Sequence, residues 1–324
     1  MRLTRRHALG ALAMAAAGRP FAAAAAWPDR PVTIVVPFPP GGSNDVITRL
    51  VAQQLSRSLG QPFVVENRPG ANGNIGAAAV ARAAPDGYTL LASGNGQNAM
   101  NHGLYARMPY DSRSSFVHVA QLASMPNALV VTANFPARSF ADLVNMARER
   151  PNQIGYASPG SGSSGHLAMA MLQRAAGIEL LHVPYRGAAP AITDVLAGQV
   201  PVLIINVDIP LPHVRAGTLR VLAVTSSERS SLYPDAPTLA EAGVPGFAAV
   251  GWVGISAPAG TPPDVVARLH AAITEALREP QLRERFAGSG YVAANGSPDD
   301  YAAFIGAEID KWGSVTRDLG ITLE

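Results

Sequence analysis

Cysteine is absent from the 324-residue chain. This absence excludes disulfide bonds, a thiol nucleophile and a cysteine-ligated metal, so the fold depends on packing for its stability. The histidines also lack the H-E-x-x-H pattern and any pairing at the spacing of metal ligands. We therefore expect this protein to bind neither a metal nor another cofactor.

An excess of basic charge is also missing when residues 1–26 are left out of the count. Residues 1–26 have the pattern of an export signal, with Arg5 and Arg6 followed by an Ala-rich apolar run and small residues before Trp27. Removal of the segment takes four arginines, which leaves 21 basic residues against 23 acidic ones. We expect no binding to nucleic acid, because the mature chain carries no basic excess. The arginine pair favours twin-arginine export, whereas Ala8 in place of an aromatic residue keeps the general secretory route open.

Long apolar runs are missing after residue 26. No run approaches the roughly 18–20 residues that a membrane-spanning helix needs. We therefore expect a soluble protein of the periplasm. Hydrophobic residues make up 48% of the chain, and 31 Gly and 27 Pro accompany them, which is typical of compact α/β proteins with many short connections.

Strand and helix patterns alternate along the chain. A first series over residues 32–92 reads strand, helix, strand, helix, strand, which predicts a parallel sheet. A second series of the same kind covers residues 129–225. Two β-rich segments, 116–125 and 246–257, flank the second series, and the pattern becomes helical after residue 263.

This order predicts two lobes, because single hydrophobic cores stop growing near roughly 250–300 residues. Lobe 1 is expected to be discontinuous, with residues 27–123 and 250–324, and lobe 2 to be an insertion of residues 124–249. The chain then crosses between the lobes twice. Small-molecule sites favour such interfaces and the carboxyl ends of parallel strands.

Two segments, residues 32–50 and 154–173, repeat one local plan. Each has an apolar strand, a glycine-rich turn and an amphipathic helix that starts with small polar residues. Glycine lets the backbone approach a ligand closely, and the free N–H groups at a helix start favour an anion. We call residues 38–45 the first anion loop and residues 158–166 the second anion loop, and we expect them to face each other from different lobes.

The candidate ligand-binding residues follow from these loops. The first anion loop supplies Phe38, Pro39, Pro40, Gly41, Gly42, Ser43, Asn44 and Asp45. The second supplies Ser158, Gly160, Ser161, Gly162, Ser163, Ser164 and His166. The loop after the third strand adds Ser93, Asn95 and Gln97 for the far end of a ligand. In the alternative reading, Ser43 or Asn44 only caps a helix, and residues 93–101 form a solvated connection.

Enzymatic readings of the same motifs are weaker. Residues 160–165 fit the dinucleotide pattern G-x-G-x-x-G, but Glu179 stands before the next strand, whereas a ribose-binding acid belongs at its end. The G-x-S-x-G pattern of serine hydrolases is absent after residue 26. We expect a binding protein without catalysis of its own.

Several longer motifs, in their order and spacing, resemble one family. The segments PFPPGGSND, GQPFVVENRPGANGN, HVPYRGAAPAITDVLAGQV and YPDAPTLAEAGVPGF are similar to those of Bug-type substrate-binding proteins of tripartite tricarboxylate transporters. The resemblance implies a type II periplasmic-binding-protein fold, with two α/β lobes joined by two crossing strands. It also implies a monomer that closes on a small mono- or dicarboxylate and delivers it to membrane transporter subunits. A receptor of the same fold that signals to a sensor kinase is the alternative, and an envelope α/β enzyme is the remote one.

Three positions depart from the family pattern. Pro201 and Ile205 stand where acidic residues are common, and Gly165 stands where glutamine is frequent. Asn206, which matches the family, remains a candidate ligand-binding residue. Loss of a carboxylate from the site is expected to disfavour ligands that carry an ammonium group.

Overall fold

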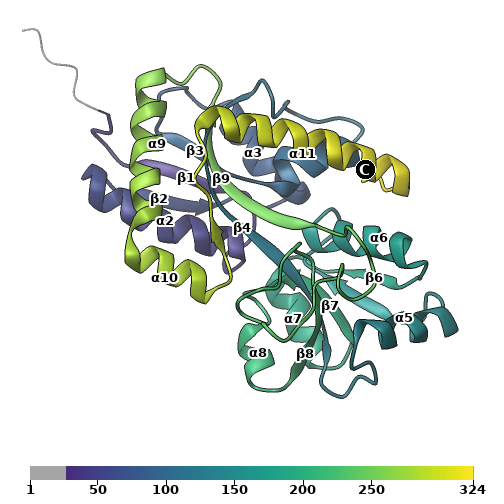
Figure 1. The fold of residues 1–324 in the computed structure, drawn as a ribbon. Helices are drawn as coiled ribbons and strands as arrows, with labels where there is room; N and C mark the ends of the chain where they lie inside the picture. Colours follow the sequence, from purple (N-terminus) through teal and green to yellow (C-terminus); the bar gives the residue numbers. More distant parts are fainter. Residues whose placement is uncertain (1–26, 324) are drawn as a thin grey trace, which may run out of the picture.

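The computed structural model describes residues 27–323, so the predicted export signal lies outside the described residues. Two α/β lobes share one long strand, β4 (Phe116–Thr132) (Figure 1). Its first part pairs with β9 (Val250–Pro258), and its last part pairs with β7 (Val202–Asn206) and β8 (Leu219–Val224). The two-lobe α/β fold expected from the sequence is confirmed. The predicted lobe bounds stay a prediction; the pairing of β4 passes from β9 to β7 between Pro126 and Asn127.

Lobe 1 is a sheet in the order β2-β1-β3-β9-β4, covered by helices on both faces (Figure 1). Its other strands are β1 (Val32–Val36), β2 (Phe63–Asn67), β3 (Thr89–Gly94) and β10 (Val292–Ala293). Its helices are α2 (Ser43–Leu59), η1 (Ala71–Gly73), α3 (Asn74–Ala81), η2 (Gly96–Met100), α4 (Asn101–Leu104), α9 (Pro263–Arg278), α10 (Pro280–Gly288) and α11 (Pro298–Leu319). Side chains of β1 alternate between the faces: Ile34 packs in the cluster of α2 and α9, whereas Val35 packs in that of α3.

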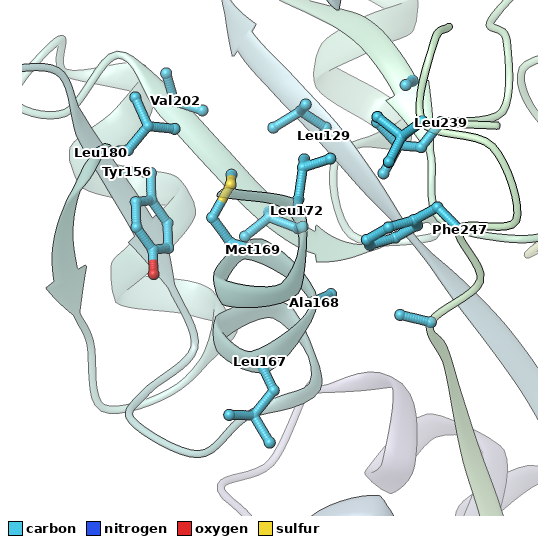
Figure 2. Packing of buried hydrophobic residues seen from close by; sticks show 14 of the residues in the cluster. Leu129, Tyr156, Leu167, Ala168, Met169, Leu172, Leu180, Val202, Leu239 and Phe247 are labelled. Atoms are coloured by element: carbon cyan, nitrogen blue, oxygen red, sulfur yellow. The ribbon is translucent and has the colours of Figure 1, made fainter. Parts of the chain in front are cut away.

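Lobe 2 is built in the same way. Its strands run β4-β7-β5-β6, with β5 (Gly155–Ser158) and β6 (Leu181–Pro184) parallel to each other. Its helices are α5 (Phe140–Glu149), α6 (Ser164–Ala176), α7 (Ala188–Leu196) and α8 (Leu211–Arg215). Figure 2 shows Met169 and Leu172 of α6 among Leu129 and Val202 of the sheet. The same cluster includes Trp312 of α11, so the lobes pack against each other in this conformation.

One prediction and one alternative interpretation of the local structure were wrong. Residues 116–125 and 129–132 form one strand, not two, because Pro126 falls where the pairing changes partner and its missing N–H costs no bond. Residues 93–101 form no solvated connection: every one of them is buried, and η2 and α4 occupy most of the segment. Its amides bond back to the chain instead of to water, with the Gln97 side chain donating to the Ala92 carbonyl.

Within residues 27–323, no helix combines the length and the apolar character that a bilayer crossing needs.

Candidate functional site

The first anion loop joins β1 to α2 and is braced by Asp45. The Asp45 carboxylate accepts from the Gly41 N–H at 3.0 Å and from Asn67 at 2.9 Å, and it forms an ion pair with Arg49. Burial acts to raise the pKa of Asp45, but the bonds to Arg49, Gly41 and Asn67 outweigh it and hold this pKa below its ordinary value. Its contacts therefore make Asp45 a support of the loop, and a direct ligand role for it stays a prediction.

Helix α2 begins without a side-chain cap. Its N-cap is Gly42, which makes no side-chain hydrogen bond. The alternative that Ser43 or Asn44 caps this helix is therefore wrong. The N–H groups of the first turn of a helix have no partner within the helix, so α2 presents them, with the positive end of its dipole, at the end of the loop.

The second anion loop joins β5 to α6 and is shaped by two histidines. The Gly162 N–H donates to His166 Nδ1 at 3.0 Å, and the His166 and His182 rings stack with centroids 4.0 Å apart. His182 Nε2 is hydrogen-bonded to Ser158 Oγ at 2.7 Å. Burial lowers the pKa of His166 to about 4, and burial together with His166 lowers that of His182 to about 3. Both rings are neutral at pH 7, so they add no positive charge to this loop.

Three serines lie in the second anion loop at or just before the start of α6. Ser163 is the N-cap of α6, and its Oγ accepts from the His166 N–H at 3.3 Å. Ser164 Oγ donates to Asn127 Oδ1 at 3.4 Å. Ser161 and Ser163 stay partly exposed, and the hydroxyl proton of the capping Ser163 remains free to donate.

Asn127 is a site residue that sequence reasoning missed. It lies directly across from Asn206 in the pairing of β4 with β7, so both side chains point to the same face as α6. Its Nδ2 is buried and has no partner within residues 27–323. The signal was present in the sequence, because Asn127 follows the predicted crossing segment just before an apolar run.

Lobe 1 contributes a similar group of amides. Asn44 Oδ1 and Gln97 Oε1 are buried without a partner in the described chain. Both side chains lie beside Gly94, and Gln97 Oε1 also lies with the Phe38 ring beside Gly73. An unpaired buried polar atom costs about 1–3 kcal/mol, so these atoms favour a polar occupant beside the loops.

Two polar contacts join the anion loops to the opposite lobes. Ser43 Oγ donates to Asp208 Oδ1 at 2.7 Å, and Asn72 Nδ2 donates to the Gly162 carbonyl at 2.9 Å. Pro39 lies next to Gly187 as well. Each anion loop therefore contacts the opposite lobe at the interface, and the expectation that the two loops face each other stays a prediction. Sequence reasoning missed Asn72 and Asp208, whose partners are distant in the chain.

Ser93 and Asn95 do not fit the role predicted for them. Ser93 is 0% exposed and its hydroxyl is paired with the Tyr301 hydroxyl in the core. The Asn95 side chain bonds the backbone of β9 at Val250 and Trp252. Both residues fix the end of β3, and neither has a free group for a ligand.

The three residues that depart from the family pattern are accommodated by the packing around β7. Ile205 is 1% exposed and packs under α7, and Pro201 lies at the far end of β7. A Cβ on Gly165 would lie 2.5 Å from the Ile204 carbonyl oxygen. Helix α6 thus approaches β7 too closely for any side chain at this position.

This contact makes Gly165 a stability position. We expect Gly165→Ala to lower the free energy of unfolding by about 1–3 kcal/mol, because the added methyl group meets backbone and not a movable side chain. Urea denaturation measures the change. Gly306→Ala in α11 is the matched control, since its Cβ has ordinary contact with Arg113 only, and alanine should stabilise that helix by up to about 1 kcal/mol. Equal stability of the Gly165 variant and the wild type would contradict the assignment.

Within residues 27–323, no three His, Asp or Glu side chains gather as a possible set of metal ligands.

The geometry of the two lobes defines the class of protein. Two α/β lobes joined by β4 and β9, each with a glycine-rich loop that opens a helix and contacts the opposite lobe, make a two-lobed solute-binding protein. Residues 47–321 match the profile of the Tripartite tricarboxylate transporter family receptors. The protein BugT of Bordetella pertussis is 40% identical over 92% of either chain.

Solved structures agree with this class. The chain is similar to Rpa4515 of R. palustris, solved with adipate, at 39% identity and a TM-score of 0.88, over 91% of this chain and 99% of that one. It is also similar to MatC of Rhodopseudomonas palustris, solved with malate, at 33% identity and a TM-score of 0.84, over 89% and 99%. The chain belongs to the tripartite tricarboxylate transporter receptor family and is a Bug-type substrate-binding protein, not an enzyme. The type II periplasmic-binding-protein fold is thereby confirmed.

Proposed function

We propose that this protein captures a small organic mono- or dicarboxylate between its lobes in the periplasm and delivers it to a tripartite tricarboxylate-type membrane transporter. The observation that carries the proposal is the pair of glycine-rich loops that open α2 and α6 on different lobes, each of which makes a hydrogen bond to the opposite lobe. Adipate and malate in the related structures support the ligand class.

The binding energy of such a site is sufficient without arginine or lysine. A hydrogen bond to a charged group contributes about 1.5–3 kcal/mol, and a helix end adds about 0.3–1 kcal/mol. Four or five such bonds, after the cost of association, reach the roughly −8 kcal/mol of a micromolar complex. Of the predicted residues, we propose Phe38, Gly41, Gly42, Asn44, Ser161, Ser163, Ser164 and Asn206 as the ligand contacts, with Asn127 added from the structure.

A comparison of adipate with adipamide, its neutral diamide, gives the sharpest test. Adipate at 100 times its dissociation constant should stabilise the fold by roughly 2.7 kcal/mol and raise the melting temperature by several degrees. Adipamide has the same length without charge and should give no shift. Malate and monocarboxylates then define the preferred length. Shifts with neutral sugars or with cations, and none with any acid, would refute the proposal.

A further inference from the structure

We propose that Asp208 is a positioning residue of the ligand site, a carboxyl group on lobe 2 that ties the first anion loop to lobe 2 when the lobes close. The inference rests on the proposed function, because it concerns the affinity of that same site. Asp208 follows β7, two residues beyond Asn206.

Two hydroxyl groups of lobe 1 donate to the one carboxyl group of Asp208 on lobe 2. Ser43 Oγ donates to Asp208 Oδ1 at 2.7 Å, and the Tyr291 hydroxyl donates to Asp208 Oδ2. Ser43 starts α2, whereas Tyr291 lies between α10 and β10. Both donors belong to lobe 1, so neither bond can form when the lobes are apart.

These bonds act on the part of lobe 1 that meets the ligand. Ser43 is the first residue of the helix whose free N–H groups end the first anion loop. Ser43 is 3% and Tyr291 4% exposed, so water competes little for either bond. Closing the bonds therefore fixes α2 in the orientation that a bound carboxylate needs.

The surroundings of Asp208 contain no direct cation partner within the described chain. Tyr291 and Tyr233 face it, and burial raises the pKa of both, so they stay neutral donors. Arg215 acts on Tyr233 from α8, and on the α2 side Asp45 is neutralised by Arg49. Burial raises the pKa of Asp208 above its ordinary value, against the opposing bonds from Tyr291 and Ser43.

The sign of the pH effect follows from this environment. In an open form, where water reaches the carboxyl group, Asp208 has a pKa near the ordinary 3.8, and the closed form holds the proton more tightly. The advantage of the closed form is therefore complete below the ordinary pKa. It falls as pH rises towards the raised pKa and is constant above it. Ligand affinity, which needs closure, falls over the same interval.

Calorimetric titration with adipate between pH 4 and pH 8 tests the proposal. Asp208→Asn is neutral and nearly isosteric: its amide oxygen accepts from one hydroxyl group and its NH2 donates to the other, so these hydrogen bonds do not vary with pH. Protonation of adipate itself cancels in the ratio of wild-type to variant affinity. We expect that ratio to fall at least fivefold as pH rises. Asp208→Ala should weaken binding at least tenfold at pH 4, because both hydroxyl groups lose their acceptor. Tyr291→Phe keeps the ring and should give a smaller loss.

Two results would overturn the proposal. One is a wild-type to Asp208→Asn ratio that does not vary with pH, and the other is affinity of Asp208→Ala and Tyr291→Phe within twofold of wild type. If wild type bound no carboxylate at any pH, the proposed function would fail instead. Small-angle scattering of the ligand-free protein would then decide about Asp208: a larger radius of gyration for Asp208→Ala at pH 4 supports the tie, and equal radii refute it.

Discussion

Ser163→Asp is expected to weaken carboxylate binding at least tenfold, about 1.4 kcal/mol, while the protein stays folded. Ser163 caps α6 by accepting from the His166 N–H, and aspartate caps helices as well as serine does. The new carboxylate would occupy the helix start that the ligand needs. Two like charges about 4 Å apart near a protein surface repel by about 4 kcal/mol, so tenfold is a lower bound.

A neutral variant of nearly the same size separates the effect of charge on affinity from the effect of side-chain shape. Ser163→Asn has nearly the same size as the aspartate variant and also caps helices, so it should bind the ligand within about threefold of wild type. Calorimetric titration with adipate measures both variants, and circular dichroism checks their fold. Equal affinity of the two variants would place the ligand away from the second anion loop.

Local signals were enough to predict much of this fold. Helices α5 and α11 carry such signals, because Ser139 and Ser297 cap their first turns within a few residues of sequence. The two anion loops were equally readable, since each consists of adjacent strand, turn and helix patterns. Signals of this kind need no knowledge of the rest of the chain.

Contacts between distant segments could not be predicted. Asn72 and Gly162 are 90 residues apart, and Ser43 and Asp208 are 165 apart, so no local pattern marks either pair. The amides after β3 left a solvated loop open as an alternative, but they pair with the backbone and with side chains elsewhere in lobe 1. Composition shows that polar groups are present and does not show which partner satisfies them.

Gly162 is the position where the second anion loop touches lobe 1, and Gly162→Ala is expected to hold the lobes apart. A Cβ there would lie 2.7 Å from Asn72 Nδ2, which is held by a hydrogen bond to Asn101, and 2.9 Å from Cδ1 of the buried Leu104, both on lobe 1. A ligand gripped from both lobes binds fully only in the closed form. We therefore expect adipate affinity to fall at least tenfold, and the radius of gyration with ligand to stay above that of the wild-type complex.

In Gly162→Ala, the effect of backbone strain must be separated from the effect of the steric clash with lobe 1. Gly162 has a φ of +77°, and Gly177, at the other end of the same helix, has a φ of +62° with nothing within 4 Å of a built Cβ. Gly177→Ala should therefore lower the free energy of unfolding by about 1–2 kcal/mol, as backbone strain alone does. It should leave adipate affinity and the radius of gyration unchanged. If Gly162→Ala bound adipate as tightly as Gly177→Ala, one lobe would suffice for binding, and the second anion loop would be only a turn.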